Sequence, residues 1–355
     1  MNGLYEKSLK EWADQEMIAN EFISVLSKLF YDKSIELVLY RNQLVDRSAS
    51  KILYMHSYAE NLVGAKLNIN ISLMLAKSIL HCNVSPSKLD VGKLNMEWEE
   101  EGKNYIDSDD FIETKLKNYI NADTTLEKPV DVVLYGFGRI GRLLARELVI
   151  QGNGKQLRVR AIVTRGNDAN QIEKRASLLR HDSVHGQFRG IALESPDDKT
   201  IYINGHKVLM LAANAPEEID YTEYGINNAI LIDNTGIFRD REGLSRHLNA
   251  KGISKVVLTA PGKGDIPNIV YGVNHSSIDF SEENILSAAS CTTNAAAPVL
   301  SIIEENIGIE KGHLETVHSY TNDQNLLDNF HKKTRRGRSA PLNLVITEKG
   351  AAKEV

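Results

Sequence analysis

An apolar strand that leads directly into a glycine turn is the feature that most limits how this chain can fold. Residues 130–135 are mostly apolar and β-branched, and the pattern Gly-x-Gly-x-x-Gly follows at once. Glycines so placed permit a tight turn, close approach of the backbone to a pyrophosphate and close packing of helix on strand. The helix predicted at residues 142–151 would offer its first N–H groups to phosphates. The cofactor-binding residues expected here are Gly136, Phe137, Gly138, Arg139, Ile140 and Gly141.

The glycine pattern alone is weak evidence, and later segments give it a context. Strand-like stretches recur, and a helix is predicted at residues 242–250. The strand-like stretches lie at residues 157–164, 199–203, 207–211, 229–232 and 255–259. Strands that alternate with helices predict a doubly wound α/β sheet of the Rossmann type.

The residues after the second strand bear on the choice of cofactor. NAD-binding folds place an acid there to hold the ribose 2′-hydroxyl. Here Arg165 and Gly166 come first, and Asn167 and Asp168 follow. If Arg165 takes the acid's place, it could pair with a 2′-phosphate, which predicts NADP or mixed use. If Asp168 keeps the acid's role, NAD is predicted, and the sequence leaves both alternatives open.

A second candidate for chemistry is Cys291, which lies in the run Ser290-Cys291-Thr292-Thr293-Asn294. An apolar segment precedes this run, and a helix-like segment at residues 299–309 follows it. A thiol at the start of a helix meets the positive end of the helix dipole, which favours the nucleophilic thiolate. His318 follows further along the chain and could serve as the base. A small buried cysteine that only packs is the alternative interpretation.

These two segments, residues 289–294 and 316–321, resemble the active-site segments of phosphorylating glyceraldehyde-3-phosphate dehydrogenases. Further segments agree with this family in the same order. They lie at residues 135–142, 181–188, 234–238, 271–275 and 350–353. The resemblance extends from about Lys128 to Val355. It predicts a Rossmann NAD(P)-binding domain over 130–289 and the start of an α+β catalytic domain over 290–355.

The resemblance implies a reaction and a set of residues. Cys291 would attack glyceraldehyde 3-phosphate, with His318 moving the protons, and inorganic phosphate would cleave the thioester to give 1,3-bisphosphoglycerate. The implied enzyme belongs to glycolysis or gluconeogenesis, uses NAD or NADP and forms a homotetramer. Loop residues expected to border the cofactor are Thr235, Gly236, Phe238 and Thr259. Residues expected to bind substrate or phosphate are Ser290, Thr292, Thr321, Arg338, Lys349 and Gly350, with Lys349 in place of the family's usual threonine.

Residues 1–121 lie outside this resemblance. Their apolar spacing predicts a mainly helical extension with helices at residues 49–63, 69–80 and 109–119 and a strand at 36–40. We expect loops or surface at residues 86–92 and 97–102. The extension holds no catalytic constellation in its sequence, which favours a structural or docking role over a second active site. Residues 122–129 are polar, end in proline and suit a linker.

Composition excludes several classes of protein. The chain has 42 basic and 47 acidic residues, so it lacks the overall positive charge that would favour nucleic-acid binding. The basic run at residues 332–338 is predicted to be a solvated loop, which the resemblance places near a neighbouring subunit. No apolar run reaches the roughly 18 residues of a membrane helix. Without a secretory start, and with two cysteines that cannot form a disulfide framework, we expect a cytoplasmic protein. His56, His81 and Cys82 show no metal-ligand spacing, so we expect no metal.

Two alternatives stay open at this point. Erythrose-4-phosphate dehydrogenase shares the thiol chemistry and would fit the same motifs. The chain also ends within a family motif at residues 350–353, so it reads as truncated. An inactive fragment that binds cofactor and forms oligomers is therefore the second alternative.

Overall fold

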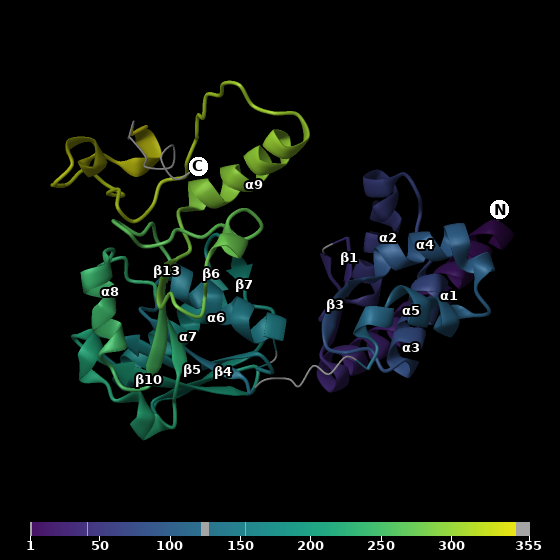
Figure 1. The fold of residues 1–355 in the computed structure, drawn as a ribbon, viewed down its shortest axis with the longest axis horizontal. Helices are drawn as coiled ribbons and strands as arrows, with labels where there is room; N and C mark the ends of the chain where they lie inside the picture. Colours follow the sequence, from purple (N-terminus) through teal and green to yellow (C-terminus); the bar gives the residue numbers. More distant parts are fainter. Residues whose placement is uncertain (1, 41, 122–127, 153, 346–355) are drawn as a thin grey trace. The chain divides into compact units, whose positions relative to one another are not determined.

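The computed structural model describes residues 2–40, 42–121, 128–152 and 154–345. The chain divides into two compact units, a first unit of residues 1–128 and a second unit of residues 129–355 (Figure 1). Residues 122–127 of the predicted linker lie outside the described residues. None of the described helices combines the length and the hydropathy that a membrane span requires.

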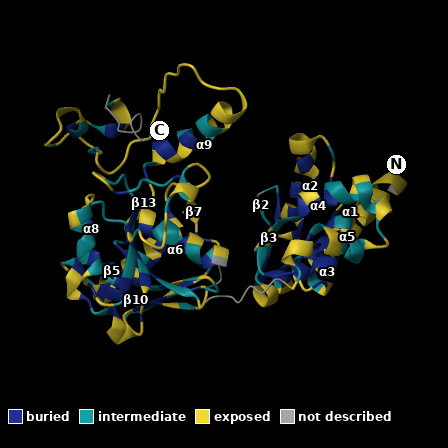
Figure 2. Ribbon diagram, in the orientation of Figure 1, coloured by how far each residue is buried: buried dark blue, intermediate teal, exposed yellow. Residues whose placement is uncertain are grey.

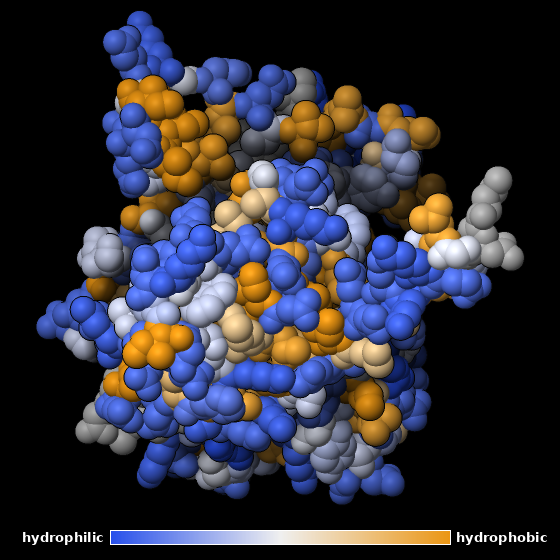
Figure 3. Space-filling model, turned by 90° about the vertical axis from the view of Figure 1, so that its right-hand side faces the viewer, coloured by the Kyte–Doolittle hydropathy of each residue, from blue (hydrophilic) through white to orange (hydrophobic). Residues whose placement is uncertain are grey.

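The first unit is mainly helical, as its sequence predicts. Its longest helix, α1 (Asn2–Lys33), buries Phe22, Leu26 and Leu29, which recur at the spacing of one helix face. These side chains pack in one core with residues of the other helices. The other helices are α2 (Ala49–Val63), α3 (Ile69–His81), α4 (Val91–Glu101) and α5 (Ser108–Lys115). On the surface drawn in Figure 3, hydrophobic groups are interrupted by hydrophilic ones.

A small three-stranded sheet completes the first unit. Its strands are β1 (Ile35–Leu39), β2 (Asn42–Gln43) and β3 (Ser87–Asp90), in the order β2-β1-β3. β2 runs antiparallel to β1, and β3 runs parallel to β1. β1 is the predicted strand of residues 36–40, shifted by one residue.

The structure corrects two predictions of loops in this unit. Residues 87–90 form β3, and residues 91–101, including most of the acidic run, form α4. Asp90 caps α4, because its side chain accepts hydrogen bonds from the N–H groups of Gly92 and Lys93. Lys115 forms ion pairs with Glu97 and Glu101, which offsets repulsion among the acidic side chains. The long charged run is therefore the exposed end of a helix that is anchored by its buried start.

The second unit is organised around an eight-stranded sheet. Six neighbouring strands are parallel, and two antiparallel strands lie at one edge. The order is β13 (Ile285–Ser287), β12 (Ile253–Leu258), β11 (Ala229–Asp233), β4 (Val130–Tyr135), β5 (Leu157–Thr164), β10 (His206–Ala212), β9 (Thr200–Ile203) and β8 (Ala192–Ser195). A short ribbon of β6 (His181–Asp182) and β7 (Gly186–Gln187) lies outside this sheet.

Helices cover both faces of the sheet, as in a doubly wound fold. Val132 and Leu134 of β4 lie in a core cluster with residues of α6 (Arg139–Gly152) and α7 (Ala169–Arg180). Val133 and Tyr135 lie in a second cluster with Leu244 of α8 (Arg241–Leu248). Alternation along one strand thus supplies both cores, which Figure 2 shows as dark blue on the central elements. The predicted α/β class is confirmed.

Two helices begin earlier than their sequences predict. α6 starts at Arg139, inside the glycine motif, where the prediction placed its start at residue 142. The last helix, α9 (Cys291–Asn306), includes Cys291, whereas the predicted segment began at residue 299. In the described residues after α9, regular structure is confined to the 3₁₀ turns Thr334–Gly337 and Ala340–Leu342.

Candidate active site

The candidate cofactor loops meet at the carboxyl edge of the parallel sheet. β12, β11, β4 and β5 are neighbours and parallel, so the loops that follow them emerge on the same edge. The chain first winds from β4 to β5 and later places β11 on the other side of β4. This reversal is a topological switch point, where open α/β sheets bind ligands. The glycine turn follows β4 and therefore lies at that point.

The backbone of the turn requires glycine at two positions. Gly136 has a φ of +90°, and a Cβ there would lie 2.9 Å from the Thr235 side chain. A Cβ on Gly141 would lie 2.5 Å from the carbonyl oxygen of Gly136. At Gly138 a Cβ would meet nothing within 4 Å, so the middle of the turn faces open space. This arrangement fits the cradle of a dinucleotide pyrophosphate.

The side chains of the turn have different surroundings. Phe137 is buried in the sheet core, so only its backbone can face a ligand. Ile140 is half exposed. Arg139 reaches Asp182 with an Nε to Oδ2 distance of 3.3 Å, and Arg142 reaches the same oxygen at 3.3 Å. The start of α6 is thereby tied to β6.

Asp182 is a residue that the sequence did not single out. Its Oδ1 accepts the N–H groups of His185 and Val184, each at 3.0 Å. These bonds, together with the Arg139 guanidinium, hold the pKa of Asp182 well below its ordinary value. Asp182 is thus a buried anion that fixes the first turn of α6 from outside the motif.

Asp233 and Asn234, whose roles the sequence did not predict, fix the loop after β11. Asp233 Oδ1 accepts both the N–H and the hydroxyl of Thr235, at 2.7 Å each. Asn234 donates to the carbonyl oxygen of Gly136 at 3.3 Å, and the Thr259 hydroxyl donates to the Asp233 carbonyl at 3.0 Å. Three predicted loops, those of Gly136, Thr235 and Thr259, are therefore linked through two adjacent residues.

Asp233 is itself held from α8. His247 Nε2 lies 3.0 Å from Asp233 Oδ2, and both side chains are completely buried. Phe238, another predicted residue, lies edge-on to the His247 ring at a centroid distance of 5.7 Å. Gly236 has a φ of +64°, which lets the chain turn between Thr235 and Phe238. The loop after β11 is thus supported from the core.

Arg165 and Asp168 both follow β5 at the same edge. Arg165 is exposed and takes part in no ion pair with another described residue. Asp168 is the N-cap of α7, because its Oδ1 accepts the N–H of Gln171 at 3.0 Å. One carboxylate oxygen of Asp168 is thus engaged in capping. Both residues remain candidates for contact with the ribose.

We expect Arg165→Asp to lower the preference for NADP over NAD by at least about tenfold in kcat/KM. A charge-assisted contact with a phosphate contributes roughly 1.5–3 kcal/mol, and about 1.4 kcal/mol corresponds to tenfold. Steady-state rates with both cofactors measure the ratio. Arg158→Asp, at the opposite end of β5, is the matched control. An unchanged ratio in Arg165→Asp would assign the ribose to Asp168 instead.

The candidate nucleophile sits at the first position of α9. Ser290 is the N-cap, and its Oγ accepts the N–H of Thr293 at 3.0 Å. The preceding Ala289 is buried with a φ of +57°, a left-handed conformation that costs an L-residue about 1–3 kcal/mol. This strained residue turns the chain from β13 into α9. The turn exposes Cys291 at the helix N-terminus, while Thr292 is buried.

Cys291 and His318 are brought together. Cys291 Sγ lies 3.3 Å from His318 Nε2. His318 Nδ1 lies 2.6 Å from the carbonyl oxygen of Ser319. Because a carbonyl only accepts, we assign the ring proton to Nδ1, which leaves the Nε2 lone pair facing the thiol. The ring is therefore oriented to take the thiol proton.

A basic pocket of about 700 Å³ lies in the second unit. It joins the loop of Gly236 to the segment that carries the predicted Thr321. Its basic side chains are Arg239, Lys263, Lys332, Lys333 and Arg336. Asp323 also lines the pocket and pairs with Arg336. The charge of the lining favours an anionic ligand.

The other predicted phosphate residues lie elsewhere or are not described. Arg338 forms an ion pair with Asp328 at 3.1 Å and does not line the pocket, whereas Arg336, two residues earlier, does. Lys349 and Gly350 lie outside the described residues. Among the described residues, no three His, Cys, Asp or Glu side chains are grouped as a metal site would require.

Comparison with known proteins agrees with this geometry. Residues 130–241 match the family model "Glyceraldehyde 3-phosphate dehydrogenase, NAD binding domain", and residues 290–355 match the C-terminal domain of that family. A glyceraldehyde-3-phosphate dehydrogenase-like protein of Pseudomonas aeruginosa is 46% identical over 336 residues, covering 93% of this chain and 72% of the relative. This match is too long to fall within the second unit, so it includes most of the first.

Relatives named glyceraldehyde-3-phosphate dehydrogenase match a smaller part. One from Zymomonas mobilis is 41% identical over 228 residues, which is 64% of each chain. Another from Nostoc, named glyceraldehyde-3-phosphate dehydrogenase 2, is 40% identical over 226 residues, again 64% of each. The chain thus spans somewhat under two thirds of the length of these two relatives. The two family-model matches and the Pseudomonas aeruginosa relative, 72% of which this chain covers, show that the chain belongs to the glyceraldehyde-3-phosphate dehydrogenase family.

Proposed function

We propose that the chain oxidises glyceraldehyde 3-phosphate and phosphorylates the product to 1,3-bisphosphoglycerate, with reduction of NAD or NADP. The observation that carries this proposal is the 3.3 Å contact between Cys291 Sγ and His318 Nε2, at the N-terminus of α9. A thiol beside a base and a helix N-terminus is equipped for covalent attack on a carbonyl carbon.

The proposed reaction uses the two side chains in sequence. His318 Nε2 takes the thiol proton, and Cys291 Sγ attacks the aldehyde carbon to form a thiohemiacetal. The Cys291 N–H steadies the developing alkoxide, and the imidazolium returns its proton to that oxygen. The neutral imidazole can then accept the hydroxyl proton as hydride leaves the carbon. Attack of inorganic phosphate on the resulting thioester releases the acyl phosphate and restores the Cys291 thiolate.

The residues present fit a dinucleotide. Cβ atoms are excluded at Gly136 and Gly141, and space is open at Gly138. The turn and the N–H groups at the start of α6 would hold the pyrophosphate, and the loops of Thr235 and Thr259 would border the rest. When bound, the nicotinamide supplies the hydride acceptor.

The basic pocket supports the proposal that the second unit binds phosphate groups. Thr321 and Arg336 line it together with four further cations. We therefore favour Arg336 over Arg338 as the arginine that binds phosphate. A bidentate guanidinium can orient a phosphate that lysines hold only as point charges. We also propose that the protein acts in the cytoplasm as a homotetramer. In this assembly, the segment 332–338 approaches a neighbouring subunit.

The direct test is the assay of the purified chain with glyceraldehyde 3-phosphate, NAD or NADP, and phosphate. We expect reduction of the cofactor that depends on phosphate, and faster turnover than with erythrose 4-phosphate. Mass spectrometry without phosphate should detect the acyl group on Cys291. Cofactor binding without acyl-enzyme formation would refute the proposal and favour a binding module. Preferred turnover of erythrose 4-phosphate would reassign the substrate.

A further inference from the structure

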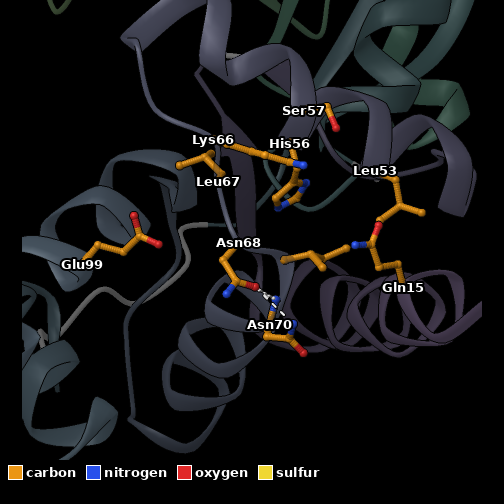
Figure 4. Close-up of a pocket in the computed structure, with 10 residues that line it drawn as sticks. Gln15, Leu53, His56, Ser57, Lys66, Leu67, Asn68, Asn70 and Glu99 are labelled. Carbon is orange, nitrogen blue, oxygen red and sulfur yellow. Dashed lines mark hydrogen bonds between the residues drawn. The ribbon is translucent and has the colours of Figure 1, made fainter. Parts of the chain in front are cut away.

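The first unit contains an open pocket of about 460 Å³ that has no part in the dehydrogenase chemistry (Figure 4). It lies among four helices, because it is lined by Gln15 of α1, Leu53 of α2, Asn70 of α3 and Glu99 of α4. Its volume is within the range of small-molecule sites, roughly 300–1,000 Å³. The pocket is therefore large enough for a small metabolite.

The lining carries one side chain of each charge. Lys66 lies in the segment between α2 and α3, and Glu99 lies near the end of α4. Neither forms an ion pair or a side-chain hydrogen bond with another described residue. Figure 4 shows Glu99 on one side of the space and Gln15 with Leu53 on the opposite side. One cation and one carboxylate in the same pocket match a ligand that carries both charges.

A buried polar network holds the wall of the pocket in place. The carbonyl oxygen of Asn68, a lining residue, accepts a hydrogen bond from Asn95 Nδ2 at 2.9 Å. Asn95 Nδ2 also donates to Ser72 Oγ at 2.9 Å, and His56 Nε2 lies 3.0 Å from that same hydroxyl. Asn68 Oδ1 accepts the N–H of Asn70 at 2.9 Å. The network fixes the residues that follow Lys66.

His56 belongs to the wall and leaves the charge balance unchanged. Its Nδ1 lies 2.8 Å from the Ile52 carbonyl, which assigns a proton to Nδ1 and leaves Nε2 to accept from Ser72. Burial lowers the pKa of His56 and keeps the ring neutral. Lys66 and Glu99 are therefore the charged groups of the pocket.

The lining narrows the class of ligand. No Phe, Tyr or Trp among the described residues lines the pocket, so it offers no ring on which a nucleobase could stack. A phosphate would meet one lysine and would be repelled by Glu99. Leu53, Leu67 and Ile69 are core residues, and the small unburied parts of their side chains line the space between the polar groups. These features favour a small zwitterion with an apolar part.

We propose that this pocket binds a free α-amino acid with an apolar side chain. Lys66 pairs with the carboxylate, Glu99 pairs with the ammonium group, and the side chain lies against Leu53 and Leu67. In the alternative interpretation, Lys66 and Glu99 are ordinary solvated surface charges that line the pocket but bind no ligand. The two interpretations differ in whether binding requires both ends of the zwitterion.

Tryptophan fluorescence of the full chain offers a local readout. The chain has two tryptophans, and both lie in the first unit. Trp12 lies on α1 near Gln15, and Trp98 lies beside Glu99 on α4. We expect leucine to change the fluorescence in a saturable way. 4-Methylpentanoate, which lacks the ammonium group, and 3-methylbutylamine, which lacks the carboxylate, should bind at least about tenfold more weakly.

Substitutions complete the test, with calorimetry as a second measurement. Lys66→Gln and Glu99→Gln should each weaken leucine binding at least about tenfold. Lys93→Gln and Glu100→Gln, which change exposed charges of α4 that do not line the pocket, should leave it unchanged. The proposal is wrong if none of the standard amino acids binds at concentrations up to about 10 mM, which is about tenfold above a Kd of 1 mM. Equal binding by the two leucine analogues, or by the Lys66 and Glu99 variants, would also overturn it.

Discussion

Cys291→Ser is expected to lower kcat for the oxidation of glyceraldehyde 3-phosphate on the order of 10⁴-fold, while cofactor binding is preserved. A serine hydroxyl at the first position of α9 would face His318 in the same way, but it is a far weaker nucleophile than a thiol. The glycine turn that would hold the cofactor is a separate element and stays intact. Steady-state rates, calorimetry with NAD and mass spectrometry of the acyl-enzyme measure the three effects.

Cys82 provides the matched control for this prediction. It is buried, and burial raises the pKa of its thiol to about 11, so it stays protonated at neutral pH. Iodoacetamide should therefore label the native chain once, at Cys291, and Cys82→Ala should be labelled to the same extent. Cys291→Ser should not be labelled. Retained turnover in Cys291→Ser, or labelling of native Cys82, would contradict the assignment of the nucleophile.

The elements of the site that could be predicted are those whose signal is local. The glycines after β4 are required by the backbone of one turn, and the sequence around them shows both the strand and the helix. Cys291 and His318 are recognisable as a thiol and a base in family-like segments. Their contact at 3.3 Å and the orientation of the ring by Ser319 needed the structure.

The residues that escaped prediction act through partners distant in the chain. Asp182 pairs with Arg142 at the start of α6. Asn234 donates to the carbonyl oxygen of Gly136, which lies 98 positions earlier in the sequence. No periodicity or spacing marks such a contact, because the sheet order brings the loops together. Arg336 lies in the 3₁₀ turn and lines the pocket, whereas Arg338 follows the turn and pairs with Asp328, a difference that sequence spacing does not show.

In the first unit, the predictions of loops at residues 86–92 and 97–102 were wrong because these segments are rich in polar residues. β3 is a short strand with little apolar character, so alternation gives no signal, and its pairing with β1 depends on tertiary contacts. The acidic end of α4 resembles a surface loop in sequence. Its helix is stabilised by the Asp90 cap and by Lys115, which lies on α5. Local patterns therefore underestimate regular structure where the stabilising partner is on another element.

Asp233→Ala is expected to lower the free energy of unfolding of the second unit by about 3 kcal/mol, because it leaves several buried hydrogen-bond donors without an acceptor, at about 1–3 kcal/mol each. The carboxylate is completely buried and accepts hydrogen bonds from His247 Nε2 and from the N–H and hydroxyl of Thr235. Alanine would leave these donors without an acceptor. Because Thr235 packs on the glycine turn, we also expect weaker NAD binding.

Urea unfolding followed by circular dichroism measures this loss, and tryptophan fluorescence separates the units. Both tryptophans lie in the first unit, so the fluorescence transition should be the same in Asp233→Ala as in the native chain. Glu217→Ala removes the exposed partner of Arg246, the residue before His247, and is the control for a surface ion pair. It should change stability little, since exposed pairs are screened by solvent. If Asp233→Ala were no more destabilising than Glu217→Ala, the buried pair could not be what anchors the Thr235 loop.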